Sequence, residues 1–258
     1  MPQRDKTYFI SDLHLGSAHH ADPEASERRI VRLLEAIRPT AERLFLVGDI
    51  FDFWFELRYA IPKGNTRFLG KLAQMADEGI EIHLFTGNHD AWYFDYLQHE
   101  IGLTVHTRHL ITTLNGKRLY ISHGDREDQS SYWVGVMRNL FDNKICQRLF
   151  AAIHPRWTFG FAHAISIASR RRGERINRKQ KDYSFRGEAN ERLIKFAKTH
   201  AATAERCDYY IFGHRHIDLD MQLAANSRIL ILGEWFKIHS YATLEPDGSI
   251  VLELFEPQ

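Results

Sequence analysis

The sequence predicts an α/β protein with a mixed β-sheet, and three observations lead to this prediction. Short apolar runs alternate with amphipathic helical patterns over the first part of the chain, as in successive strand–helix–strand units. Later, Asn115-Gly116 and Asp247-Gly248 each separate two strand-like segments, which is the pattern of tight antiparallel hairpins. A length of 258 residues with 44 % hydrophobic residues is enough to bury one large core, with or without an insertion.

The apolar runs and helical patterns define the expected elements in order. Two amphipathic helices are predicted, over residues 26–38 and 66–78, because their apolar residues recur at positions i, i+3, i+4 and i+7. The hairpins add antiparallel strands to the parallel units, so we expect the sheet to be mixed. Buried strands are predicted at residues 8–10, 44–47, 80–85, 119–121, 209–212 and 229–232.

Residues 127–199 interrupt this pattern and predict a helical insertion. They contain no clear strand, and the helical patterns break near Pro155 and Gly173. A basic run within them is either a solvated helix face or part of a cap over a site. We expect a core of residues 1–126 and 200–258 with a helical cap, residues 127–199, inserted into it. The basic residues are Arg170, Arg171, Arg172, Arg175, Arg178, Lys179, Lys181 and Arg186.

Composition excludes several classes of protein. The formal net charge of +1 gives no basic excess, so we expect no stable nucleic-acid partner. Two cysteines, Cys146 and Cys207, are too few for a disulfide framework and suit a reducing compartment, which predicts a cytoplasmic protein. The first residues lack the apolar stretch of a secretory leader, and no later run reaches the roughly 18 apolar residues of a membrane span. Any membrane contact is therefore expected to be peripheral.

A polar motif follows each of five predicted strands: SDLHLG, GDIFD, GNHD, SHGD and GHRH. In α/β sheets the ligand crevice lies outside the carboxyl ends of the strands, so we expect these motifs to converge. A single Asp in such a place is commonly a helix N-cap, and a single His is commonly a surface residue, but five successive motifs favour one shared site. The candidate residues are Asp12, His14, Asp49, Asn88, His89, Asp90, His123, His214 and His216.

These residue types suit a metal centre. Carboxylate, imidazole and amide oxygen without thiolate are ligands for Mn²⁺, Fe or Zn²⁺, and so many donors favour two ions over one closed zinc site. Residues i and i+2 point the same way in a strand, so Asp12 and His14 can both reach one cavity if the extended geometry continues, as can the histidines of GHRH. Asp49 is the candidate bridge between two ions. Glycines at positions 48, 87, 124 and 213 allow sharp turns and close approach.

The order D-x-H, G-D, G-N-H-D, H-G-D, G-H-x-H resembles that of the calcineurin-like metallophosphoesterases, from residue 12 to residue 216. The resemblance implies a sandwich of two mixed β-sheets flanked by helices, and two divalent ions, with Mn²⁺ as the expected metal. It implies that His89 stabilises the transition state or acts as an acid, with Asp90 orienting it. One ion would be held by Asp12, His14, Asp49 and His216, and the other by Asp49, Asn88, His123 and His214.

Longer stretches carry a narrower resemblance: GDIFDFWFE, PKGNTRFLGKL, TGNHDAWYFDYL, HPRW and GHRHIDLDMQL. They are similar to the UDP-2,3-diacylglucosamine pyrophosphohydrolases of lipid A synthesis, in their Bacteroides-like form. This implies cleavage of a lipid-linked nucleotide sugar to UMP and 2,3-diacylglucosamine 1-phosphate, in peripheral contact with the cytoplasmic face of the inner membrane. The alternative substrate is another nucleotide, a phosphomonoester or a phosphodiester. The expected substrate contacts are Asn88, His89, Arg170, Arg171, Lys179 and Lys181; enterobacterial enzymes have Arg where this chain has His89.

Several residues near the motifs are interpreted without a functional role. His19 and His20 lie in a polar loop before a helix and are expected to face solvent. Trp54 and Phe55 are expected to pack in the core, and so are Glu234 and Trp235, which follow the last predicted buried strand.

Overall fold

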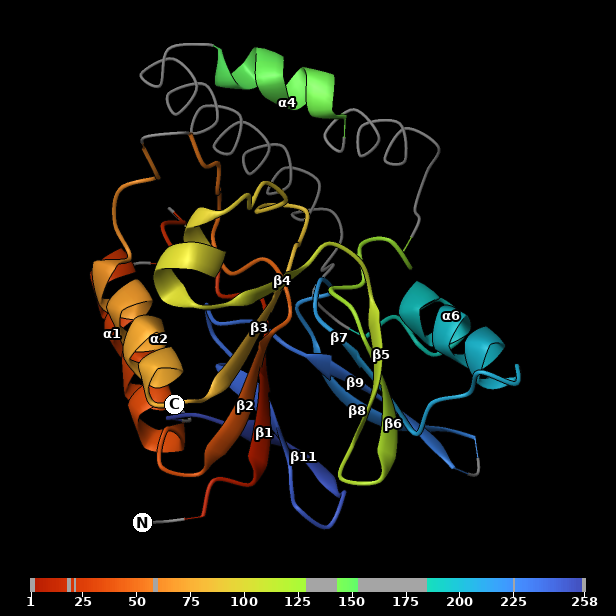
Figure 1. Ribbon diagram of the computed structural model, residues 1–258. Coiled ribbons are helices and arrows are strands. Elements are labelled where there is room, and N and C mark those ends of the chain that lie inside the picture. The colour runs from red at the N-terminus through yellow and green to blue at the C-terminus, as the bar shows by residue number, and fades with distance from the viewer. Residues whose placement is uncertain are drawn as a thin grey trace.

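Two mixed β-sheets form the centre of the computed structural model, with helices on their outer faces (Figure 1). The structure describes residues 3–17, 20, 22–57, 60–128, 143–152, 185–224 and 226–256. The two sheets confirm the fold that the family resemblance implied, whereas the strand pattern alone suggested a single mixed sheet.

The first sheet has the strand order β11-β10-β1-β2-β3-β4. Its strands β1 to β4 are parallel, while β10 is antiparallel to both β1 and β11. The predicted hairpin at Asp247-Gly248 joins β10 to β11 and is confirmed. The bounds are β1 Lys6–Ile10, β2 Ala41–Leu46, β3 Glu81–Phe85, β4 Thr104–His106, β10 Ser240–Leu244 and β11 Ile250–Leu254.

The second sheet has the order β5-β6-β7-β9-β8. Strands β6, β7 and β9 are parallel, and the antiparallel strands β5 and β8 form its two edges. The Asn115-Gly116 turn joins β5 to β6 as predicted. The bounds are β5 Leu110–Leu114, β6 Lys117–Ile121, β7 Tyr209–Phe212, β8 Asp218–Ala224 and β9 Ser227–Leu232.

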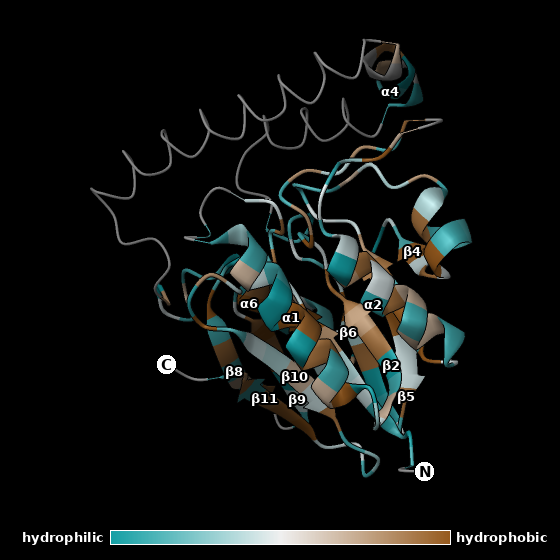
Figure 2. Ribbon diagram, turned by 90° about the vertical axis from the view of Figure 1, so that its left-hand side faces the viewer, coloured by the Kyte–Doolittle hydropathy of each residue, from teal (hydrophilic) through white to brown (hydrophobic). Residues whose placement is uncertain are grey.

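Helices cover both outer faces, so the core divides into three apolar layers. Helices α1 (Pro23–Ile37) and α2 (Thr66–Asp77) pack on the first sheet. Helix α6 (Arg192–Ala201) packs on the second sheet, and the third layer lies between the sheets. Figure 2 shows hydrophobic strands beneath helices whose outward faces are hydrophilic. The apolar residues whose spacing predicted α1 and α2 therefore form the sides of these helices that face the sheet, as expected for amphipathic helices.

Two further helices lie toward the edge at which the functional motifs gather. The short π-helix η1 (Leu97–Ile101) precedes β4, and α4 (Lys144–Ala151) lies within the expected insertion (Figure 1). The expected boundary between residues 199 and 200 falls inside α6, whose Leu193 and Ile194 are fully buried against the second sheet. Helix α6 thus belongs to the core by its packing.

Most of the expected cap is outside the described residues, including the candidate substrate contacts Arg170, Arg171, Lys179 and Lys181. Within the described part of the chain, no helix has the length and apolar character needed to cross a membrane.

Candidate dinuclear metal centre

The loops after β1, β2, β3, β6 and β7 bring their polar motifs together at the carboxyl ends of these strands. Hydrogen bonds join the loops across the two sheets: the Nδ1–H of His123 donates to the carbonyl of Val47 at 2.9 Å, and the amide of His214 donates to the Asp12 carboxylate at 2.9 Å. The predicted convergence of the motifs is confirmed.

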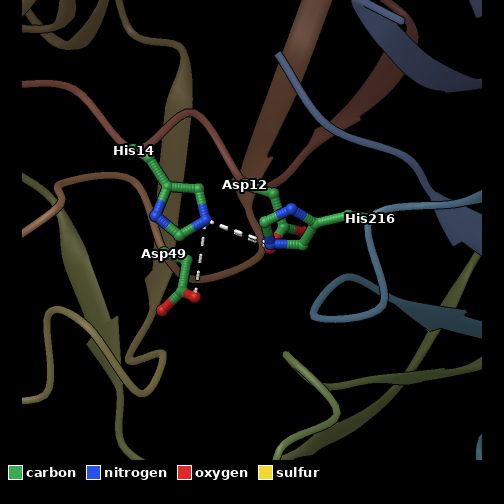
Figure 3. Close-up of side chains that lie close together, drawn as sticks. All are labelled: Asp12, His14, Asp49 and His216. Atoms are coloured by element: carbon green, nitrogen blue, oxygen red, sulfur yellow. Dashed lines mark hydrogen bonds and ion pairs between the residues drawn. The ribbon is translucent and has the colours of Figure 1, made fainter. Parts of the chain in front are cut away.

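The first group of candidate ligands consists of Asp12, His14, Asp49 and His216 (Figure 3). One ligand atom from each lies within 4.8 Å of the others. The Nε2 of His14 is 3.7 Å from Oδ1 of Asp12 and 3.7 Å from Oδ2 of Asp49. The Nε2 of His216 is 3.2 Å from Oδ1 of Asp12. The ligand atoms of these four side chains are close enough together to bind a single cation.

A second group adjoins the first through Asp49. The Nε2 of His123 is 3.3 Å from Oδ2 of Asp49 and 3.4 Å from Oδ1 of Asn88. The Nδ1 of His214 is 3.0 Å from the same Asn88 oxygen. Because Asp49 contributes to both groups, it occupies the place that a bridging carboxylate needs.

The backbone reaches this arrangement differently from the sequence-based expectation. The strands do not continue in extended geometry; instead, several candidate ligands adopt the left-handed region, which non-glycine residues rarely enter. The condition for the expected alignment of residues i and i+2, that extended geometry continues past the strand, is therefore not met, although both members of each pair reach the centre. The φ values are 54° at Asp12, 43° at His14, 51° at Asp49, 67° at His214 and 53° at His216.

Two glycines permit the close approach of these loops. A Cβ atom on Gly87 would overlap the carboxylate and amide nitrogen of Asp49, and one on Gly213 would overlap the hydroxyl of Ser11. Neither position tolerates a larger residue without displacing a loop of the centre. The predicted role of these glycines in close packing is confirmed.

Neighbouring histidines hold the two buried aspartates of the centre in their charged form. Burial alone would raise the pKa of the Asp12 carboxyl, but the charge of His216 and the imidazole nitrogens of His14 and His216 beside its Oδ1 lower it well below its ordinary range. Burial would also raise the pKa of Asp49, but the charges of His123 and His89 lower it. Burial lowers the pKa of His14 to about 4, so its imidazole is neutral and able to act as a ligand.

His123 behaves differently from His14 because of its neighbour. Burial opposes its charge, but the adjacent Asp49 carboxylate raises its pKa to about 10. Oδ1 of Asp12 is buried, and no described residue gives it a hydrogen bond of good geometry, although Nε2 of His216 lies 3.2 Å away. A buried carboxylate oxygen without a donor is costly unless a cation satisfies it. Oxygen and nitrogen donors with such an oxygen at their centre fit divalent cations of the Mn²⁺, Fe or Zn²⁺ type.

Asp90 does not make the contact that was expected with His89. Its carboxylate is fully buried and accepts hydrogen bonds from the amides of Gly87, Asp49, Ile50 and Phe51 and from the Tyr93 hydroxyl. Burial and the charge of Asp49 raise the pKa of Asp90 to about 6. The carboxylate oxygens of Asp90 accept from backbone amides of both loops. Asp90 therefore fixes the loop after β2 against the loop after β3.

Asp52 takes the place beside His89 that had been expected for Asp90. The Nδ1–H of His89 donates to the carbonyl of Asp52 at 3.2 Å, and the Asp52 carboxylate lies 3.8 Å from the same nitrogen. This carboxylate is also 4.0 Å from Nδ1 of His14. Sequence reasoning missed Asp52, although it is the last residue of the GDIFD motif and lies three positions after Asp49.

The loop from β9 to β10 lines the other side of the centre. The ring of Phe236 lies 5.4 Å from that of His14 and 4.6 Å from that of His20. His20 is only 8 % exposed; its Nε2–H donates to the Leu13 carbonyl at 3.0 Å. The expectation that His20 faces solvent was therefore wrong, because this loop folds over it; His19 lies outside the described residues.

The remaining packing expectations are confirmed. Trp54, Phe55 and Trp235 are buried, and the amide of Trp235 donates to the Asp12 carbonyl at 3.2 Å. Glu234 is also buried, and its carboxylate accepts hydrogen bonds from the amides of Phe236, Lys237 and Ile238.

Fold and site together define a metal-dependent phosphoesterase class, and comparison with known proteins agrees. The model of the calcineurin-like phosphoesterase family matches residues 6–218, so the chain belongs to this family. A UDP-2,3-diacylglucosamine hydrolase from Porphyromonas gingivalis is 49 % identical over 262 residues, covering 98 % of each chain. A UDP-2,3-diacylglucosamine hydrolase from Haemophilus influenzae is 27 % identical, covering 92 % of this chain and 93 % of its own.

Among solved structures, a dimetal phosphatase from Danio rerio aligns with 98 % of this chain and 100 % of its own, with a TM-score of 0.45 and 13 % identity.

Proposed function

We propose that this chain is a metal-dependent hydrolase that cleaves the pyrophosphate of UDP-2,3-diacylglucosamine to UMP and 2,3-diacylglucosamine 1-phosphate, a step of lipid A biosynthesis. The observation that carries the proposal is the 49 % identity, over 98 % of both chains, to a relative with this named activity. The convergence of seven candidate ligands in this chain supports the same chemistry: Asp12, His14, Asp49, Asn88, His123, His214 and His216.

The proposed ligand assignment follows the two groups around Asp49. Asp12, His14, Asp49 and His216 would hold one ion, and Asp49, Asn88, His123 and His214 the other. Mn²⁺ is the proposed metal, as the family resemblance implies, and it is one of the ions that such oxygen and nitrogen donors bind. Two such ions, when bound, polarise a phosphoryl oxygen and activate water at neutral pH.

His89 is the proposed acid of the reaction. Its Nδ1–H is occupied by the Asp52 carbonyl at 3.2 Å, which sets the orientation of the ring. A protonated His89 then presents Nε2–H to the developing charge on the departing oxygen, a contribution of about 10² to 10⁴-fold in this kind of catalysis. Asn88 and His89 are also proposed to contact the substrate. Asp90 supports both residues by fixing their loop.

We further propose a peripheral position on the cytoplasmic face of the inner membrane, where a diacylated nucleotide sugar resides. The part of the expected insertion that precedes α6 would act as a helical cap over the centre. Arg170, Arg171, Lys179 and Lys181 are the proposed partners of the pyrophosphate or of anionic headgroups. In this arrangement, the aromatic residues of the insertion would hold the acyl chains.

The test is a substrate panel with phosphorus NMR of the products, in the presence of Mn²⁺, Mg²⁺, Zn²⁺ or a chelator. The proposal expects UMP release from UDP-2,3-diacylglucosamine with Mn²⁺, none with chelator, and poor turnover of nitrophenyl phosphate esters. Faster turnover of a soluble nucleotide, a phosphomonoester or a phosphodiester would replace the proposed substrate. Retained turnover in chelator would refute the metal-dependent chemistry.

A further inference from the structure

Arg215 lies between two candidate ligands that belong to different metal positions. His214 faces the group that contains Asn88, whereas His216 faces Asp12 and His14. One short loop, residues 213–216, therefore contributes to both halves of the centre. Any contact that fixes Arg215 acts on both halves at once.

A buried, bidentate ion pair fixes Arg215. Its Nε donates to Oε2 of Glu191 at 3.0 Å, and its Nη2 donates to Oε1 at 3.1 Å. The Glu191 side chain is 1 % exposed and that of Arg215 is 13 % exposed. A bidentate pair fixes the position of the arginine side chain as well as contributing stability, because two parallel hydrogen bonds allow only one orientation of the guanidinium plane.

The loop needs such an external constraint. His214 has φ of 67° and His216 has φ of 53°, and both values lie in the left-handed region. Non-glycine residues in this region cost about 1–3 kcal/mol each unless the surrounding structure holds them. Arg215 stands between these two strained positions, so its contact with Glu191 holds the backbone on both sides of it.

Glu191 is a rigid anchor, because it immediately precedes helix α6. The next two residues of the helix that face the sheet, Leu193 and Ile194, are fully buried. Glu191 also accepts a hydrogen bond from the amide of Arg186 at 3.1 Å. Close packing of α6 against the sheet therefore holds Glu191 in place, and Glu191 in turn holds Arg215.

A second contact joins the same helix to the same loop. Arg192 donates from Nη1 to Oδ1 of Asp128 at 3.3 Å, and the other Asp128 oxygen lies 3.7 Å from Nε2 of His214. The start of α6 is thus connected to the loop both through Arg215 and, by way of Asp128, through the nitrogen of His214 that faces away from Asn88.

We infer that Glu191 is a positioning residue for both metal positions, acting through Arg215 on the loop that carries His214 and His216. This inference rests on the proposed function, since it takes both histidines as ligands. Outer contacts that orient ligands commonly contribute 10- to 100-fold to metal affinity, and we expect an effect on the order of 10-fold at each position here.

The test compares Mn²⁺ binding by isothermal titration to metal-free samples of the full chain and of Arg215→Lys, Glu191→Gln and the double variant Arg215→Met/Glu191→Gln. The double variant removes the pair without leaving a buried unpaired charge, so it keeps the fold where a single change fails. Arg32→Lys is the matched control, because Arg32 makes a bidentate pair with Glu256, at 2.7 and 2.6 Å, away from the centre.

We expect both Mn²⁺ dissociation constants to rise by about 10-fold in the double variant and to stay unchanged in Arg32→Lys. We also expect kcat to recover at saturating Mn²⁺, which a general loss of folding would not allow. If the unaltered chain binds two ions and the double variant keeps both constants, the inference is overturned and the proposed function stands. A rise in one constant only would also overturn it. If the unaltered chain binds no Mn²⁺, the proposed function itself fails.

Discussion

The two ends of the sheets both contain residues with positive φ, but the residue types differ. At the end with the hairpin turns, these positions are Asn115, Gly116 and Gly248, which adopt such angles at little cost. At the end with the candidate centre, Asp12, His14, Asp49, His214 and His216 adopt the same region. Turn residues are chosen for conformation, whereas residues of the centre are chosen for their donor atoms, and the surrounding contacts hold them in place.

The largest expected effect is at the residue shared by both ligand groups. Asp49→Ala removes a carboxylate that lies 3.7 Å from His14 and 3.3 Å from His123. We expect turnover to fall by more than about 100-fold, beyond the range of changes that only support a ligand. The measurement is UMP release at saturating Mn²⁺, with Asn115→Gly at the other end as the control. Retained turnover in Asp49→Ala would refute the shared position.

A pair of glycine substitutions compares the two ends directly. In Gly87→Ala the new methyl group would overlap Asp49, whereas in Gly116→Ala nothing lies within 4 Å of it. Gly116→Ala therefore costs only the strain of its φ of 73°, about 1–2 kcal/mol, and leaves Mn²⁺ affinity unchanged.

Gly87→Ala is expected to weaken Mn²⁺ binding as well as stability, because Asp49 must move. Denaturant unfolding and Mn²⁺ titration of both variants check this contrast. Equal losses of Mn²⁺ affinity in the two variants would remove the distinction between the two ends.

The smallest expected effect concerns two half-buried histidines outside the centre. The Nδ1 of His83 in β3 is 3.1 Å from Nε2 of His106 in β4, and their rings stack on Phe45 and Phe85. Burial lowers the pKa of both histidines. At His83, the charge of Glu81 opposes this shift and that of Arg43 adds to it. At His106, the charge of His83 lowers the pKa further. Below the ordinary value of 6.5, the unfolded chain therefore binds more protons than the folded chain.

Stability contributed by this pair is complete above pH 6.5 and is lost as pH falls below it. Denaturant unfolding of metal-free protein at a series of pH values is the measurement. The variant His83→Gln/His106→Gln should lose less stability between neutral pH and about pH 5 than the unaltered chain. An identical pH dependence would show that acid sensitivity comes from elsewhere, such as the centre.

Much of the fold followed from local patterns. The apolar run at Tyr209–Phe212 and the Asn115-Gly116 turn each specify an element through residues adjacent in sequence. The candidate ligands were also recognised, because each follows a strand and strand ends converge. Local patterns do not reveal which residue, far away in the sequence, a given side chain contacts.

Three residues illustrate this limit. Asp52 and Asp90 both lie near His89, and only the three-dimensional contacts assign the first to the imidazole and the second to the backbone. Nothing adjacent in the sequence indicates a role for Arg215, because its partner Glu191 is 24 positions away. The left-handed backbone of the ligands was missed for the same reason: tertiary contacts, not residue type, maintain it.

The hairpin turns have a separate consequence for engineering of the chain. The side-chain amide of Asn115 donates to the Glu245 carbonyl at 2.8 Å, and the Tyr209 hydroxyl donates to the Gly248 carbonyl at 3.0 Å. These contacts join one sheet to the other at the margin farthest from the ligands. A circular permutant opened at residues 115–116 would disturb the contact of Asn115 and leave that of Tyr209. New termini there would therefore weaken the connection between the sheets, while every donor atom of the centre stayed in the polypeptide.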